Sequence, residues 1–162
     1  AYNWDRPKHV LLEPYFLKQF RHRWYLIGIN REYKAFRAYS LDRVKQMVMG
    51  EDTFTFPRKF VADDYFEDCF GIIREENLFP QRTVLRVAAG QAPYLRNLPL
   101  HRSQKVIAMT NEYVDFELCL SHTYDFIQEL LSKGATIEVL EPQSLRDRME
   151  EEVMKMQKLY GL

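Results

Sequence analysis

The sequence predicts an α+β protein with a small β-barrel near its N-terminus and a helix-containing sheet in its C-terminal half. Two observations support this. Residues 10–50 contain short aromatic and β-branched runs separated by tight turns, which is typical of a small barrel. Residues 83–162 alternate strand-like and helix-like periods. We therefore expect parts at 8–52 and 83–162, joined by an aromatic, acidic connector at 53–82.

The first part contains three expected strands. One follows Pro14 at residues 15–17, a second spans 23–29, and a third spans 35–43 after a turn at 30–32. Residues 44–49 fit a strand or a helix equally well, because six residues are too few for periodicity to decide. In the connector, Asp63 is expected to cap a brief helix that Gly71 terminates, with the many aromatic residues packed against neighbouring elements.

The last part is predicted in more detail. Expected strands lie at 83–87, 104–110, 113–120 and 136–140, with helices at 91–98, from Thr123 to Lys133, and after Pro142. In residues 113–120 apolar side chains alternate strictly with other types, which predicts one buried face. The order strand, helix, strand, strand, helix, strand is the split βαβ arrangement of ferredoxin-like folds, here with one extra C-terminal helix.

Composition is that of a globular protein: 46% of the 162 residues are hydrophobic and 28% are charged. No apolar run is long enough to span a membrane, and the first residues do not resemble a signal peptide. Cys69 and Cys119 lie among apolar neighbours, so we expect buried free thiols rather than a disulfide. Together these features favour a cytoplasmic protein.

Positive charge is concentrated in the first third of the chain. Residues 1–50 hold ten Lys or Arg but four Asp or Glu, although the whole chain has no net charge. If the protein has an anionic partner, we expect it to bind this part of the chain. By charge alone, ordinary fluctuation of surface charge explains the asymmetry equally well. The last eighty residues are slightly acidic.

Two strand-like segments combine rings with guanidinium groups. On extended strands Arg37, Tyr39 and Arg43 share one face, and Arg23 shares a face with Tyr25. If the strands pair antiparallel, these side chains can converge on one patch that binds phosphate and stacks on bases.

Each of these residues also has a purely structural interpretation. We expect Trp24, Leu26 and Phe36 to be core residues, whereas core packing and ligand stacking are nearly balanced for the two tyrosines. For Arg37, pairing with an acid such as Asp42 competes with ligand binding.

The segments Arg23-Trp24-Tyr25-Leu26 and Arg37-Ala38-Tyr39-Ser40-Leu41-Asp42-Arg43-Val44 resemble the WYL domain family. The resemblance covers roughly residues 8–50. Residues 66–71 and 83–160 resemble the extension that often follows such domains, through Gly134-Ala135, Glu141-Pro142 and Leu145-Arg146.

This resemblance implies an Sm-like, SH3-type barrel and a ligand-sensing module of a bacterial transcriptional regulator. The implied effector is single-stranded DNA or RNA, or a nucleotide. The implied ligand-binding residues are Tyr25, Arg37, Tyr39 and Arg43, with His22 and Arg23 adjacent. Such modules usually follow an N-terminal winged helix-turn-helix. Only about twenty residues precede the motif, so we expect that the DNA-binding part was removed or that the protein works without one.

Two other classes of function compete with this interpretation. The apolar stripe of the last helix and the aromatic connector favour an oligomerisation or protein-interaction module, and a homodimer is expected. An enzyme acting on nucleic acid would need a nucleophile or metal cluster, but the four histidines have no metal-ligand spacing and no catalytic motif occurs. His101 and Ser103 lie two residues apart without a third orienting group. We therefore expect neither catalytic residues, nor a metal, nor a cofactor.

Overall fold

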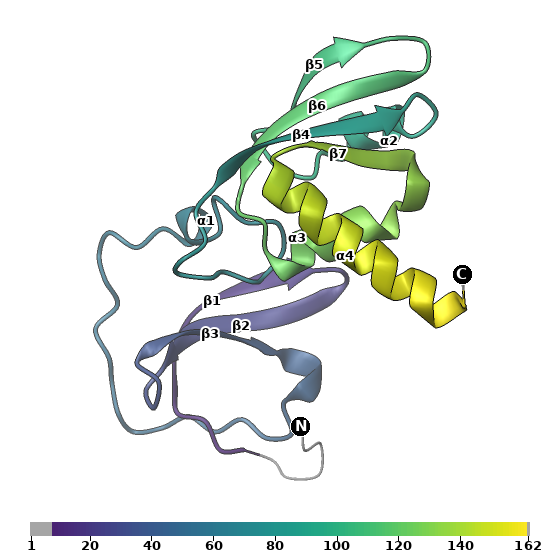
Figure 1. The fold of residues 1–162 in the computed structure, drawn as a ribbon. Helices are drawn as coiled ribbons and strands as arrows, with labels where there is room; N and C mark the ends of the chain where they lie inside the picture. Colours follow the sequence, from purple (N-terminus) through teal and green to yellow (C-terminus); the bar gives the residue numbers. More distant parts are fainter. Residues whose placement is uncertain (1–7, 162) are drawn as a thin grey trace. The chain divides into compact units, whose positions relative to one another are not determined.

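The computed structural model describes residues 8–161, and the chain divides into two compact units (Figure 1). Unit 1 comprises residues 1–65 and unit 2 comprises residues 66–162. The chain is a mixed α+β protein with one antiparallel sheet in each unit. No described helix is both long enough and apolar enough to cross a bilayer.

Unit 1 is built on a three-stranded antiparallel sheet in the order β1-β2-β3. Its strands are β1 (Leu12–Phe20), β2 (Arg23–Asn30) and β3 (Ala35–Ser40). Gly28 lies where β1 approaches β2 so closely that a Cβ atom would come within 2.2 Å of the carbonyl oxygen of Glu13. Glycine is therefore required at the centre of β2.

The expected barrel is not closed among the described residues. β3 ends at Ser40 rather than at Arg43, because the chain tightens into a 3-10 turn, η1 (Leu41–Arg43), in which the Val44 amide donates to the Leu41 carbonyl. Residues 44–56 then form neither strand nor helix. With no fourth strand in the described part of unit 1, the sheet stays open.

The connector supplies the core of unit 1, as its aromatic composition predicts. Tyr15 and Phe36 lie 4.8 Å apart between ring centroids, and rings from the following segment surround them. These rings belong to Phe54, Phe56, Phe60 and Tyr65. The helix α1 (Ala62–Tyr65) is shorter than expected, because the chain enters unit 2 immediately after it.

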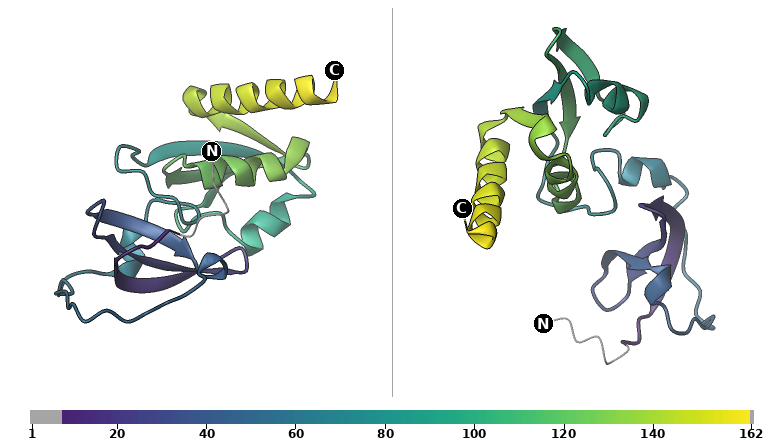
Figure 2. Two further views of the ribbon diagram at one scale, coloured as in Figure 1. Left: turned by 90° about the horizontal axis from the view of Figure 1, so that it is seen from below. Right: turned by 90° about the vertical axis from the view of Figure 1, so that its right-hand side faces the viewer.

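Unit 2 follows the predicted order of elements. It contains β4 (Gln81–Ala88), α2 (Ala92–Asn97), β5 (Lys105–Met109), β6 (Tyr113–Leu120), α3 (Tyr124–Ser132), η2 (Gly134–Thr136), β7 (Ile137–Glu141) and α4 (Gln143–Tyr160). The sheet has the order β5-β6-β4-β7, and every neighbouring pair is antiparallel. Figure 2 shows α4 as a single straight helix that continues from β7.

One face of this sheet carries the core of unit 2. Leu85 and Val87 of β4 and Phe116 and Leu118 of β6 are buried there, as the alternation along residues 113–120 predicts. They pack with buried side chains from the helices, namely Ala92, Leu95, Phe126, Ile127, Leu130 and Leu145. The opposite face carries charged side chains, with Arg82 largely exposed and Asp115 buried beside Arg86.

The second half of the connector is fixed to unit 2 by hydrogen bonds. The Asp125 carboxylate accepts from the amides of Ile72 and Ile73, at 2.9 and 3.1 Å. Gly71 has φ of +89°, and a Cβ atom there would lie 2.4 Å from that carboxylate. The Ser121 amide also donates to the Asp68 carbonyl at 2.7 Å. Residues 66–73 therefore belong structurally to unit 2.

Neither cysteine forms a disulfide bond, but the predicted burial of Cys119 is wrong. Cys69 is partly buried and Cys119 is exposed. Cys119 occupies the open face of β6, opposite Arg82 of β4. Its apolar sequence neighbours, Leu118 and Leu120, point to the core instead, so local composition gave the wrong face.

His122 is a buried titratable group between β6 and α3. Its Nε2 atom lies 2.7 Å from the hydroxyl of Thr83, and its ring stacks on Phe126 at 5.9 Å. Both His122 and Thr83 are almost completely buried. Burial, followed by the nearby Arg148, lowers the pKa of His122 from 6.5 to about 4. The folded protein therefore keeps this imidazole neutral.

This gives a pH dependence of stability. Because the pKa of His122 is lower in the folded protein than in the unfolded chain, its contribution is complete above pH 6.5 and is lost as the pH falls towards 4. We expect this group to remove about 2 kcal/mol from the free energy of unfolding between pH 7.5 and pH 5. Urea unfolding at both pH values measures this difference. His122→Gln should have a flatter profile, and an equally steep profile in the variant would contradict the assignment.

Candidate anion-binding face of unit 1

The register of β2 against β3 separates the predicted ligand residues into two groups. Tyr25 pairs with Ser40, whereas Leu26 pairs with Tyr39 and Gly28 pairs with Arg37. Paired residues point to the same face and successive residues alternate. Arg37 and Tyr39 therefore lie on the face opposite Arg23 and Tyr25. The expectation that the arginines and tyrosines of both strands form one patch is wrong. For that, Tyr39 would have to pair with Tyr25, but in the observed register it pairs with Leu26.

One group gathers where β2 begins and β3 ends. Tyr25 pairs with Lys18 on one side and Ser40 on the other, and Arg23 pairs with Phe20. We call the side chains of these residues, together with Asp42 and Arg43 of η1, the basic strand end. It combines cations and aromatic rings on one end of one sheet face.

Asp42 is the acid of the basic strand end. Its carboxylate accepts a hydrogen bond from the Ser40 hydroxyl and lies 3.6 Å from the Arg23 guanidinium. The Ser40 hydrogen bond, with smaller contributions from Arg23 and Arg43, lowers the pKa of Asp42 below its usual value. The sequence suggested Asp42 as a partner of Arg37, but η1 carries it to Arg23 instead.

The turn before β2 presents two further basic residues in a strained conformation. Arg21 and His22 have φ of 46° and 63°, the left-handed region that a two-residue hairpin turn of type I′ requires at both positions. Asn-Gly suits these positions far better than Arg-His. Arg21 also lies over the ring of Phe20, at 5.4 Å. Arg21 and His22 therefore hold an energetically costly backbone conformation at a basic surface.

The other group occupies the opposite face and has local partners. The side-chain amide of Asn30 donates to the Tyr39 hydroxyl at 2.6 Å, while Asn30 itself is buried. Arg37 donates to the Phe36 carbonyl and lies over the ring of Tyr33. Trp24 shares this face and is 49% exposed, so it is not the core residue that the sequence predicted.

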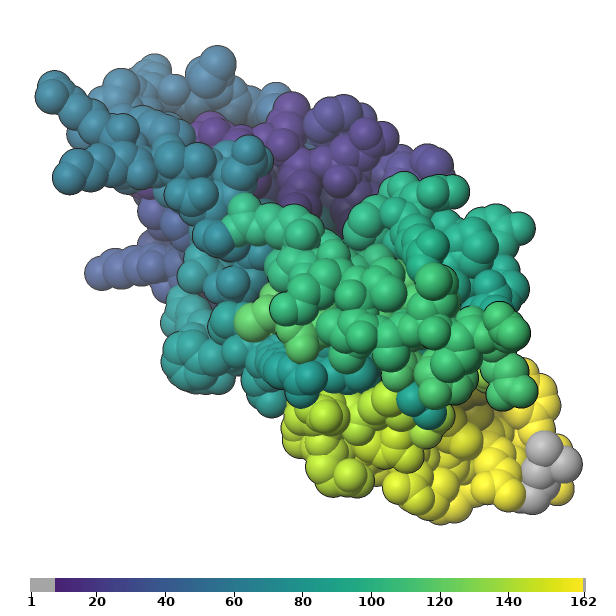
Figure 3. Space-filling model, turned by 90° about the horizontal axis from the view of Figure 1, so that it is seen from above, coloured from purple at the N-terminus to yellow at the C-terminus, as the bar shows by residue number. Residues whose placement is uncertain are grey.

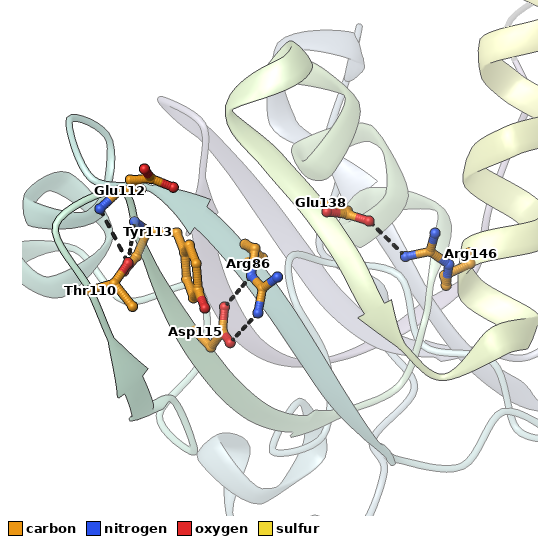
Figure 4. Close-up of polar contacts among 7 residues, drawn as sticks. All are labelled: Arg86, Thr110, Glu112, Tyr113, Asp115, Glu138 and Arg146. Atoms are coloured by element: carbon orange, nitrogen blue, oxygen red, sulfur yellow. Dashed lines mark hydrogen bonds and ion pairs between the residues drawn. The ribbon is translucent and has the colours of Figure 1, made fainter.

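The open face of unit 2 also carries arginines, and Arg82 and Arg86 each have an acidic side chain beside them. Arg86 makes two hydrogen bonds of 2.9 Å to Asp115, and its guanidinium stacks 3.8 Å from the ring centroid of Tyr113 (Figure 4). The Asp115 hydrogen bonds raise the pKa of Arg86 further. The alternation along β6 predicted that Asp115 and Tyr113 share a face. It could not predict Arg86 as their partner, because that depends on the register between β4 and β6.

Charge on that face continues as a chain of ion pairs across the sheet. Glu117 lies 2.7 Å from both Arg82 and Lys105, and Arg82 also contacts Glu141. Arg146 of α4 pairs with Glu138 of β7 at 3.0 Å (Figure 4). These acids compete with any external anion.

The pair His101 and Ser103 has a structural role in unit 2. The Ser103 hydroxyl lies 2.7 Å from His101 Nδ1 and accepts from the Cys119 amide at 2.8 Å. The other nitrogen of His101 lies 2.6 Å from the Glu67 carbonyl. The contacts tie the loop before β5 to β6 and to the connector. Within residues 8–161 no group of three His, Cys, Asp or Glu side chains could hold a metal ion.

Comparison with known proteins identifies two families along the chain. The model of the WYL domain matches residues 1–49, and the model of the WCX domain matches residues 80–157. No curated protein matches the sequence.

Among solved structures, the chain is similar to Proteasome accessory factor B/C (PafBC) of Arthrobacter aurescens, with 21% identity and a TM-score of 0.37. The similarity covers 92% of this chain and 22% of that one.

The strained turn gives a stability test of the basic strand end. Replacing Arg21-His22 by Asn-Gly should raise the free energy of unfolding by about 1 kcal/mol or more, because both positions then adopt positive φ with less strain. Equilibrium urea unfolding measures this. The same replacement at residues 32 and 33, whose φ values are not positive, is the control and should destabilise. A destabilised Asn-Gly turn at 21–22 would show that Arg21 and His22 support the fold rather than a ligand.

Proposed function

Because the chain belongs to the WYL domain family, with a WCX domain as its C-terminal extension, we propose that it is the ligand-sensing module of a transcriptional regulator. Its effector in this proposal is single-stranded nucleic acid or a nucleotide. The chain then acts as a cytoplasmic binding module rather than an enzyme. The proposal is supported above all by the basic strand end, where Arg23 and Tyr25 share one face beside η1.

The chemistry of the basic strand end suits a phosphate-containing ligand. The Arg23 side chain is about half exposed and its ion pair with Asp42 is long, so its donors remain accessible to phosphate oxygens. Arg43 follows Asp42 directly and adds positive charge to the same place. Tyr25 offers a ring on which a base can stack, which is worth roughly 1–3 kcal/mol per base. His22 extends this surface from the turn.

Single strands fit this surface better than a duplex does. Stacking on Tyr25 requires an unpaired base, and a three-stranded sheet end is too small to contact two grooves. Arg37 and Tyr39 lie on the opposite face, so they would contact only a strand long enough to pass around the sheet. We assign them to a second, weaker contact.

Sensing also requires that the ligand bind two states of the regulator with different affinity. In the proposal, a DNA-binding domain such as a winged helix is the element whose state changes. The WCX unit then completes the regulatory region. We also infer that unit 2 is a ferredoxin-like domain with an additional helix, and the strand order β5-β6-β4-β7 supports this description.

Titration with a fluorescent single-stranded oligonucleotide tests the proposal. Anisotropy measured at 50 and 200 mM salt should show binding that weakens steeply as salt increases, because phosphate contacts release counterions. Arg23→Ala should weaken binding about tenfold or more at low salt, and Arg37→Ala should have a smaller effect. Affinity that ignores salt would contradict a phosphate-led mechanism. A larger loss in Arg37→Ala would move the site to the opposite face.

A second candidate function, an oligomerisation module, is favoured by α4. Only Leu145 near its start is buried, whereas Val153, Met156 and Tyr160 are between 44% and 78% exposed. With Met149 they form one stripe at spacings of four, three and four residues, which suits helix pairing. Figure 3 shows α4 at the surface of the molecule.

Light scattering tests the oligomerisation function. If α4 pairs with a second copy, Val153→Ala combined with Met156→Ala should convert a dimer to a monomer, because both side chains are exposed in the single chain and the apolar contact is lost. Met154→Ala is the matched control, since this exposed methionine lies off the stripe. A dimer that persists in the double variant would remove α4 as the interface, and a monomeric wild-type chain would remove the function itself.

A further inference from the structure

We propose that Asp42 is a built-in competitor for the ligand: its carboxylate occupies the place beside Arg23 that a phosphate group of the effector takes on binding. Asp42 thereby sets both the affinity and the charge selectivity of the basic strand end. This inference rests on the proposed function, because it concerns the same ligand site.

The backbone brings Asp42 to this place. Ser40 ends β3 directly opposite Tyr25, and η1 then turns the chain so that Asp42 reaches back towards the first residue of β2. The Val44 amide closes that turn on the Leu41 carbonyl at 3.2 Å. A negative charge is therefore placed beside the guanidinium by the fold and does not depend on a long, flexible side chain.

Asp42 is held by its own segment rather than by Arg23. The Ser40 hydroxyl hydrogen-bonds one carboxylate oxygen, while the other lies 3.6 Å from Arg23, beyond hydrogen-bonding distance. Both ionic side chains are about half exposed. Exposed pairs of this kind contribute little to stability. The Arg23 donors can therefore be transferred to a phosphate without loss of the fold.

The contrast with Arg31 at the other end of β2 supports this interpretation. Arg31 contacts Glu13 at 2.9 Å and Asp52 at 2.8 Å, within hydrogen-bonding distance of both. The bonds to Glu13 and then Asp52 raise the pKa of Arg31. The donors of Arg31 are thus hydrogen-bonded to Glu13 and Asp52, whereas Arg23 lies near Asp42 without a hydrogen bond to it.

The position of Asp42 has a consequence for selectivity. A ligand phosphate that approaches Arg23 meets a carboxylate of like charge at close range. A single phosphate is attracted by Arg23, but repulsion by Asp42 cancels part of that binding energy. A longer strand can instead place its neighbouring phosphates away from Asp42, so that it bears a smaller share of this repulsion. The site therefore favours an oligonucleotide over a single nucleotide.

The test compares Asp42→Asn with Asp52→Asn in the full chain. Both variants remove one negative charge from unit 1, but Asp52 pairs with Arg31, which follows β2 and lies about 26 Å along the chain from Arg23. Anisotropy is measured with a short fluorescent single-stranded oligonucleotide and, by competition, with a mononucleotide. Removing a like charge at about 4 Å in water is worth about fivefold in affinity.

We expect Asp42→Asn to bind the oligonucleotide about fivefold more tightly at 50 mM salt, with a smaller gain at 200 mM. The mononucleotide should gain more than the oligonucleotide, because its phosphate cannot bind away from Asp42, so that selectivity for the oligonucleotide falls. Asp52→Asn should change affinity much less. Equal gains in both variants, or weaker binding by Asp42→Asn, would overturn the competitor role while leaving the ligand site in place. Absence of binding by the wild type and by Asp42→Asn would instead overturn the proposed function, and this inference with it.

Discussion

The antiparallel pairing of β2 with its two neighbours is the constraint on which the candidate site depends. One register sets Lys18, Tyr25 and Ser40 side by side across three strands. Because side chains alternate along a strand, this pairing decides which face each residue of β2 occupies. A shift of one residue would bring Trp24 and Leu26 to this face and move both Arg23 and Tyr25 to the other. Gly28 helps to hold the register, since the Glu13 carbonyl leaves no room for a Cβ atom there.

The same alternation gives the two faces of the unit 1 sheet different chemistry. Towards Asn30, the face of Ile27 and Phe36 is packed with the connector rings and forms the core. Towards Arg23, that same face is uncovered enough for the arginine side chain to remain about half exposed. One strand thus stabilises the unit at one end and presents charge at the other. The connector is required for this division, because its aromatic rings cover the apolar end.

Much of the fold follows from the sequence, because hydrophobic periodicity and the Gly and Pro residues that end helices and strands are local signals. The alternation from Tyr113 to Leu120 and the Gly and Pro residues around α3 and α4 predicted those elements closely. The barrel was predicted wrongly, because nothing local reveals that the chain tightens at Leu41 and leaves residues 44–56 without strand pairing. Sequence also identified Arg23, Tyr25 and Arg43 as candidates. It could not show that Arg37 and Tyr39 lie on the other face, because that depends on register, which is a tertiary property.

The central claim is that an anionic strand binds at the basic strand end. Its most direct test is a titration of the ¹⁵N-labelled chain with a short single-stranded oligonucleotide, followed by amide chemical shifts. The account predicts the largest shifts at residues 21–25 and 40–43, with small changes at Phe36 and Arg37 and in the sheet of unit 2. Shifts concentrated around Arg37 and Tyr39, or confined to unit 2, would contradict it.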